Sequence, residues 1–222
     1  MRPHPGYRII TSVATGTIFF AFLFALLVSL SLTIIRPIYL FAIHDVGGPS
    51  RQPAAVAAQL RFGVWGVCAI YAFPGGPLCF GPKIGYNVPE DLAAIAQVSQ
   101  TVLDTVESVL LAVLVLHPIV AGLGFLNLCL SIFLSIFSAE QALAVVNLAI
   151  ALITALVATT SMAVDIAIIT LARDNLHDLQ RRFTFEIEFG NAVWISIAGV
   201  SLNWLAVVLL SARACYCLGI QR

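Results

Sequence analysis

Arg61–Phe80 reads RFGVWGVCAIYAFPGGPLCF, with two cysteines on either side of a Gly/Pro turn. The flanking segments Leu60–Ala72 and Pro77–Tyr86 are rich in Phe, Val, Trp, Tyr and Ile, which favour strands. A two-strand hairpin would bring the sulfurs of Cys68 and Cys79 within bridging distance. Because persistent disulfides need an oxidising compartment, the stretch predicts an extracellular or luminal hairpin. The alternative is that all five cysteines are reduced thiols.

The rest of the chain is far more apolar than this stretch. Of its 222 residues, 60% are hydrophobic and 10% are charged, and the mean hydropathy is +1.01. Soluble proteins average about 45–50% apolar and about 25% charged residues. Lipid must therefore surround much of the chain. Basic and acidic side chains balance at 11 each, so no nucleic-acid partner is expected.

Four apolar blocks predict membrane-spanning helices at about 9–35, 106–137, 142–172 and 190–212. Each exceeds the roughly 18–20 residues that cross about 30 Å of hydrocarbon. The first block follows Arg2 and Arg8, as a signal peptide would. It is longer than the apolar core of such a peptide, so an uncleaved span is favoured. We expect one domain over residues 1–222: an all-α membrane protein, whose four-helix transmembrane bundle carries a small disulfide-braced β cap in the extracellular loop 36–105.

Two signals disagree about the side of the membrane on which this loop lies. Four spans place both termini on one side. The third connection carries Arg173, Arg181 and Arg182, and by the positive-inside rule this mildly favours a cytosolic position for both connections. The cysteine pair favours the opposite orientation, with the termini in the cytosol.

Two further elements are expected in the long loop. Pro89-Glu90-Asp91 resembles a helix start, with an early proline and acids in the first turn. Apolar residues then recur at helical spacing towards the second span. Arg36–Ile43 suits an additional strand. The loop is therefore expected to fold as a compact cap.

The residues around the cysteines resemble those of a known class. Phe62, Gly63, Trp65 and Gly66, followed by the cysteine pair, are similar to the extracellular signature of claudin-like tetraspan proteins. The second span contains HPIVAGLGF from His117, which resembles a segment of fungal PalI-type membrane proteins. Asp165, Arg173-Asp174-Asn175 and GNAVW at 190–194 fit the same family.

The resemblance implies a fungal four-span plasma-membrane protein with cytosolic termini and a disulfide-bonded first loop. PalI-type proteins are linked to ambient-pH signalling, where they help a larger sensor reach or stay at the membrane. Relatives are linked to plasma-membrane domains and cell-wall organisation. Many carry a long cytosolic tail, whereas residues 213–222 are all that follow the last block here. A role that depends on such a tail is therefore not expected.

Several polar residues lie within the apolar blocks, among them His117, Asn147 and Asp165. Asn127 and Asn203 could, like Asn147, join neighbouring helices. Intramembrane ionisable groups are costly and often functional. A proton-coupled transporter or channel would use Asp165 and His117, and the histidine also suits pH sensing. The structural reading is favoured, in which neighbouring helices satisfy these groups. Pro118 frees a backbone carbonyl that His117 can bind.

Small residues recur every four positions in the third block, which suits close packing of helix backbones. They are Ala151, Ala155, Thr159, Ala163 and Ala167. The alternative use is a groove for a partner helix or for membrane lipids. Beyond the fourth block, Cys215 and Cys217 are candidate S-palmitoylation sites.

No sequence motif supports catalysis, a cofactor or a metal site: there is no HExxH, no GxSxG and no P-loop. The favoured hypothesis is a non-enzymatic plasma-membrane scaffold or accessory subunit. Its partner would be a larger integral membrane protein, either a pH-sensor complex or a cell-wall polysaccharide synthase. The alternatives are a small transporter or channel and a claudin-like homo-oligomer.

Overall fold

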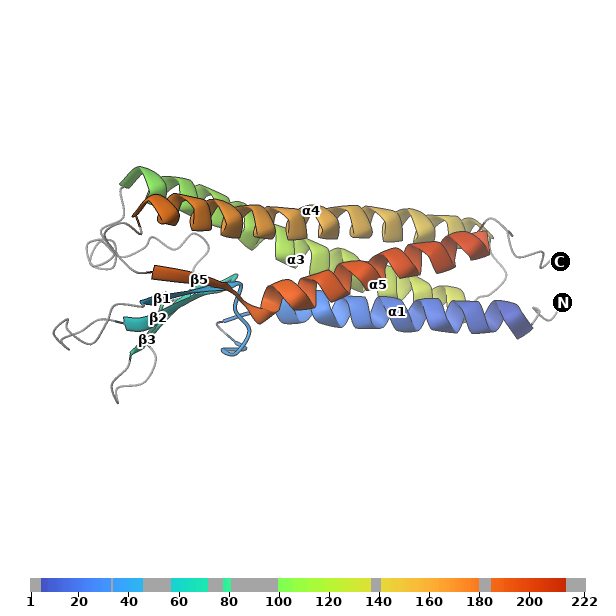
Figure 1. Ribbon diagram of the computed structural model, residues 1–222. Coiled ribbons are helices and arrows are strands. Elements are labelled where there is room, and N and C mark those ends of the chain that lie inside the picture. The colour runs from blue at the N-terminus through green and yellow to red at the C-terminus, as the bar shows by residue number, and fades with distance from the viewer. Residues whose placement is uncertain are drawn as a thin grey trace. The chain divides into compact units, whose positions relative to one another are not determined.

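The computed structural model describes residues 5–32, 34–45, 57–71, 78–80, 100–136, 141–179 and 185–214. Within these residues the helices are α1 (Pro5–Ser29), α3 (Gln100–Ile136), α4 (Gln141–Leu179) and α5 (Asn191–Ala214), as Figure 1 shows. Each contains a stretch long and apolar enough to cross a membrane: Ile9–Ser29, Val115–Ile136, Gln141–Leu171 and Asn191–Ala214. The four predicted spans are confirmed, and the chain is a multi-pass membrane protein.

The described residues form two compact units. One is built from Met1–Leu26, Leu116–Met162 and Ile195–Arg222, and the other from Leu27–Val115 and Ala163–Trp194. We refer to them as the bundle unit and the sheet unit. Each is described by itself below.

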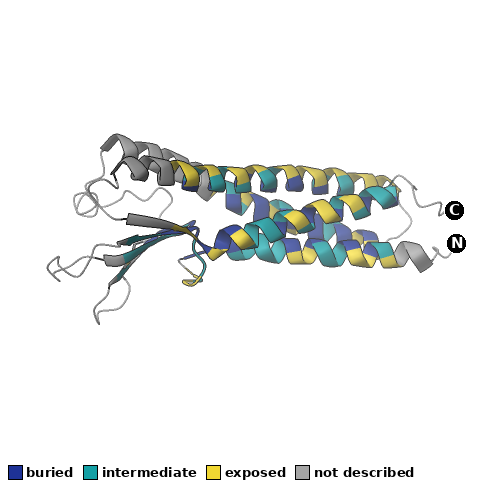
Figure 2. Ribbon diagram, viewed as in Figure 1, coloured by how far each residue is buried: buried dark blue, intermediate teal, exposed yellow. Residues whose placement is uncertain are grey.

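The bundle unit packs all four helices around one core. Its buried cluster is Ala14, Ile18, Leu128, Ala151, Ala206 and Leu210. Half of these are alanines, which let helix backbones approach closely where lipid supplies no hydrophobic drive for association. Along the helices, buried residues gather on one side and exposed residues on the other (Figure 2).

Hydrogen bonds between helices add to this packing. Thr15 and Ser131 join α1 to α3 through their hydroxyls at 2.8 Å. Arg213 Nη1 donates to Thr11 Oγ1 at 2.7 Å. The second bond places the beginning of α1 beside the end of α5, so both lie at the same end of the bundle.

The sheet unit contains five antiparallel strands in the order β4-β3-β2-β1-β5. Their bounds are β1 Phe41–Asp45, β2 Ala57–Phe62, β3 Val67–Tyr71, β4 Leu78–Phe80 and β5 Phe185–Phe189. The register gives the sheet two unlike faces, because directly paired residues share a face. One face carries Phe41, Ile43, Leu60, Phe62, Val67 and Phe189; the other carries Ala42, His44, Gln59, Arg61, Cys68, Cys79 and Glu188.

The structure corrects several boundaries. Leu60–Ala72 is not one strand, because the chain turns between Phe62 and Val67 and forms β2 and β3. The additional strand expected at Arg36–Ile43 is confirmed, shifted to Phe41–Asp45. The first span ends at Ser29 rather than at about residue 35. The helix start expected at Pro89 lies outside the described residues.

The third connection also differs from its expected form. The sequence was interpreted there as a charged link over Arg173–Asn191. Instead α4 continues to Leu179, and Phe185–Phe189 forms the outer strand β5. The sequence FEIEF alternates apolar and acidic residues, which is the pattern of a half-exposed strand and the signal that would have identified it.

Candidate functional site

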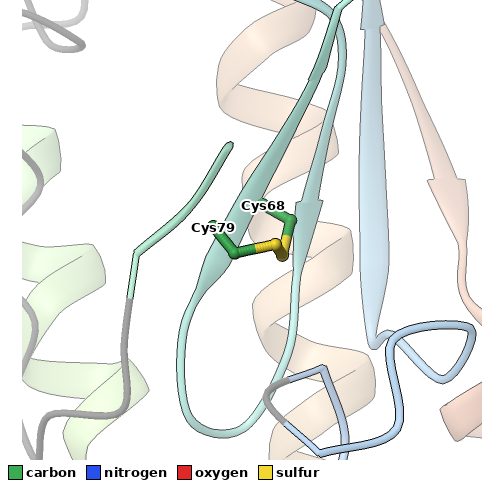
Figure 3. The surroundings of a disulfide bond; sticks show 2 residues. All are labelled: Cys68 and Cys79. Atoms are coloured by element: carbon green, nitrogen blue, oxygen red, sulfur yellow. A yellow bond between two sulfur atoms is a disulfide. The ribbon is translucent and has the colours of Figure 1, made fainter. Parts of the chain in front are cut away.

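The two cysteines of the opening stretch form a disulfide. Cys68 on β3 and Cys79 on β4 are directly paired in the strand register, with their Cα atoms 4.1 Å apart (Figure 3). Cys68 is buried and Cys79 is exposed. The predicted bridge is confirmed, and it fastens the short edge strand β4 to the rest of the sheet. Cys129 is a free thiol, while Cys215 and Cys217 lie outside the described residues.

The signature residues before Cys68 form the turn that joins β2 to β3. Gly63 N donates to Gly66 O at 3.0 Å and closes this turn. Val64 N donates to Ser31 Oγ at 3.1 Å. The Trp65 indole N–H donates to the carbonyl of Ser29, which is the last residue of α1. The turn is therefore bound to the end of the first helix.

The indole has a role that the sequence did not reveal. The last carbonyls of a helix have no partner within the helix. Trp65 supplies a hydrogen-bond donor to the carbonyl of Ser29. Trp65 is therefore a helix cap that comes from a distant part of the chain. The sequence identified Trp65 only as part of the signature before the cysteine pair.

Gly63 allows the turn to approach the residues that follow α1. A Cβ at position 63 would lie 2.3 Å from Leu32 Cβ, a distance that real Cβ atoms do not show. Leu32 itself has φ of 66°, in the left-handed region, and its side chain is 2% exposed. The close contact thus requires glycine at one position and holds a strained backbone at the other.

A second junction binds the sheet to the beginning of α5. Gly190 N donates to Leu40 O at 2.7 Å, and Ala192 N donates to Tyr39 O at 3.1 Å. Asn191 Nδ2 donates to Pro37 O at 3.1 Å. These bonds pair the GNAVW motif with residues 37–40, just before β1. A Cβ at position 190 would lie 1.9 Å from the Tyr39 carbonyl oxygen, so this position also requires glycine.

Comparison with known protein families identifies the family of this chain. The model of the SUR7/PalI family matches residues 7–206. The chain belongs to the SUR7/PalI family. This confirms the resemblance of the sequence to PalI-type proteins. A search of the curated proteins finds no match to the chain.

On the polar face of the sheet in this SUR7/PalI protein, side chains from three neighbouring strands contact one another. His44 Nε2 on β1 lies 3.1 Å from Glu188 Oε2 on β5 and 3.1 Å from Gln59 Nε2 on β2. The Arg61 guanidinium lies over the Tyr39 ring, 4.8 Å from its centroid. The motifs of the sequence had pointed to neither His44 nor Glu188.

The intramembrane residues predicted for this family member are buried. His117 is 5% exposed and Asp165 is 3% exposed, and neither is without an interaction partner. Asn147 is completely buried. Pro118 lies inside α3 and is half-buried.

The small-residue stripe on α4 divides into two parts. Ala151 and Ala155 are buried and pack in the bundle unit, and Thr159 Oγ1 accepts a hydrogen bond from Trp204 Nε1 at 3.1 Å. Ala163 and Ala167, in the sheet unit, are exposed. The packing role therefore holds for the first part of the stripe and not for the second. Within the described residues, no group of three or more His, Cys, Asp or Glu side chains is arranged to hold a metal ion.

Proposed function

We propose that this SUR7/PalI protein is a non-enzymatic scaffold or accessory subunit of the plasma membrane. It would bind a larger integral membrane protein and stabilise or localise it. The observation that carries this proposal is the construction of the sheet unit. Its strands are joined to the end of α1 by Trp65 and to the beginning of α5 by Gly190. A sheet attached to two helices in this way can serve as a rigid recognition surface close to the spans.

The disulfide supports an extracellular sheet. Cys68–Cys79 would persist only in an oxidising compartment, because cytosolic reductants keep thiols reduced. The sheet then faces the outside of the cell. Since α1 begins and α5 ends at the same end of the bundle, both termini would lie in the cytosol.

The exposed part of the α4 stripe is the proposed contact for the spans of a partner. Ala163 and Ala167 present small side chains on the helix surface, where another helix can approach closely. The five-stranded sheet would contact the same partner outside the membrane. A pH-sensor complex and a cell-wall polysaccharide synthase are the two partner classes that we propose.

The outer strand β5 disfavours self-association through its edge. In an antiparallel pair of two β5 strands centred on Ile187, Glu186 of one copy would face Glu188 of the second copy, twice. Like charges directly opposite each other destabilise strand pairing, and natural sheets use edge charges in this way. This supports a different protein as the partner over claudin-like pairing of identical sheets through β5.

Crosslinking in native membranes tests the proposal. The full-length protein is expressed at native level, membranes are mildly crosslinked, and the tagged chain is purified in detergent for mass spectrometry. We expect a large multi-span protein to be recovered with it. The double variant Ala163→Leu/Ala167→Leu should reduce that recovery at least several-fold, because leucine prevents close helix approach.

A matched control separates loss of the contact from loss of the fold. Val208 is 60% exposed on α5, so Val208→Phe adds bulk on a different helix surface. This variant should leave partner recovery unchanged. Recovery of only monomers from wild-type membranes would contradict the proposed function, and equal loss in the α4 and α5 variants would contradict the proposed surface.

A further inference from the structure

Two asparagines inside the bundle unit have fully buried amide groups. Asn127 on α3 and Asn147 on α4 are both completely buried, at 0% exposure. Within the described part of the chain, neither the side-chain nitrogen nor the side-chain oxygen of either residue has a hydrogen-bond partner. Buried polar groups in proteins are nearly always paired, so each of these four atoms calls for an explanation.

The two amides belong to the same interior. Their sequence neighbours Leu128 and Leu148 both pack in the buried cluster of the bundle. Asn127 lies nine residues before the end of α3, and Asn147 lies six residues after the beginning of α4. At 1.5 Å per residue, these positions differ in depth by about one helical turn when the helices run antiparallel.

The surrounding membrane offers these amides no alternative partner. A polar group on the surface of a soluble protein can bond to bulk water, but hydrocarbon supplies neither donors nor acceptors. Ser131, one turn beyond Asn127 on α3, is also completely buried, and its hydroxyl is bound to Thr15 on α1. The unpaired amides thus continue a polar layer inside an apolar bundle.

The chemistry of the buried amide oxygens and NH₂ groups indicates which kind of ligand can bind them. A cation such as Na⁺ would bind the two amide oxygens and leave both NH₂ groups unsatisfied. An anion would do the reverse. A water molecule both donates and accepts, so it can pair an oxygen of one amide with the NH₂ of the other. We propose that Asn127 and Asn147 bind internal water that bridges α3 to α4.

Solid-state NMR on the full-length protein in lipid bilayers tests this site. In a water-edited experiment, magnetisation starts on water and is detected on ¹⁵N. We expect the Nδ2 groups of Asn127 and Asn147 to build up signal several times faster than the backbone amide of Ala155. Ala155 is also 0% exposed and provides the dry reference. Equal build-up at all three positions would overturn the proposal.

A double-mutant cycle tests the bridge itself. Asn127→Leu and Asn147→Leu each replace one amide by an apolar group with the same branching and number of heavy atoms, and each leaves the bound water with an unpaired contact. We expect either single variant to lower Tm by several degrees and the double variant to lower it by less than the sum. Additive shifts would contradict a bridge. Coupling combined with slow water transfer would also overturn the proposal, because it would indicate a direct bond between the two amides.

Discussion

At the scale of single residues, Trp65 and Gly63 explain why the turn before the cysteines has the sequence FGVWG. The tryptophan supplies a donor to the end of α1, and the glycine leaves room for Leu32. Neither residue needs to touch a partner for the motif to be required. Both positions can be tested by conservative substitutions that change one feature at a time.

Trp65→Phe keeps an aromatic ring but removes the indole N–H. We expect it to lower the free energy of unfolding by about 1 kcal/mol, the net contribution of one hydrogen bond. The measurement is thermal unfolding in detergent. Trp194→Phe is the matched control, because Trp194 is 68% exposed. Equal shifts in the two variants would show that the cap to Ser29 contributes nothing.

Gly63→Ala adds one methyl group against Leu32. With only 2.3 Å available between the two Cβ atoms, the turn must move, and we expect a loss of about 1–3 kcal/mol. Gly122→Ala is the control, since nothing lies within 4 Å of its added Cβ. That variant should be neutral or stabilising by up to about 1 kcal/mol, because alanine favours a helix. A neutral Gly63→Ala would contradict the close contact.

At the scale of elements, the sequence predicted the features that depend on local composition. It did not predict the features that depend on contacts between distant segments. The four spans were evident because length and apolarity are local properties. The end of α1 was not, because residues 30–35 contain no Gly or Pro. That helix ends at Ser29 where Trp65 caps it and where Ser31 binds the backbone of Val64. Both contacts come from more than thirty residues away.

The sheet shows the same division. The cysteine pair and the strand-forming residues around it predicted a bridged hairpin. Gly63 and Gly66 also indicate a turn, which the prediction of a strand over Leu60–Ala72 did not take into account. The position of β5 beside β1 could not be derived, because it joins segments about 140 residues apart in the sequence. The junction between Gly190 and residues 39–40 follows from that pairing.

Gly190→Ala tests the junction between β5 and α5. The added Cβ would lie 1.9 Å from a backbone oxygen, which cannot rotate away as a side chain can. We expect a larger loss than for Gly63→Ala and faster hydrogen exchange in β5. Gly199→Ala provides the control, because its Cβ would make an ordinary contact at 3.4 Å with Phe24. Unchanged exchange in β5 would rule out this junction.

At the scale of the whole molecule, the protein combines four membrane spans with a sheet that a disulfide stabilises. The disulfide closes a loop with a sequence separation of 11 residues. Loop entropy of this size corresponds to about 3 kcal/mol. We therefore expect the double variant Cys68→Ser/Cys79→Ser to lower the stability of the sheet by about that amount, measured by hydrogen exchange of β3. Exchange equal to wild type would show that the bridge does not stabilise the sheet.

We propose that this sheet lies outside the cell with Cys68 and Cys79 joined by their disulfide. Intact cells are treated with a membrane-impermeant reductant and an impermeant alkylating reagent, and peptides containing Cys68 and Cys79 are identified by mass spectrometry. We predict a linked peptide without reductant and alkylation of both cysteines after reduction, without permeabilisation of the cells. Free thiols before reduction would contradict the disulfide, and labelling only after permeabilisation would contradict an extracellular sheet.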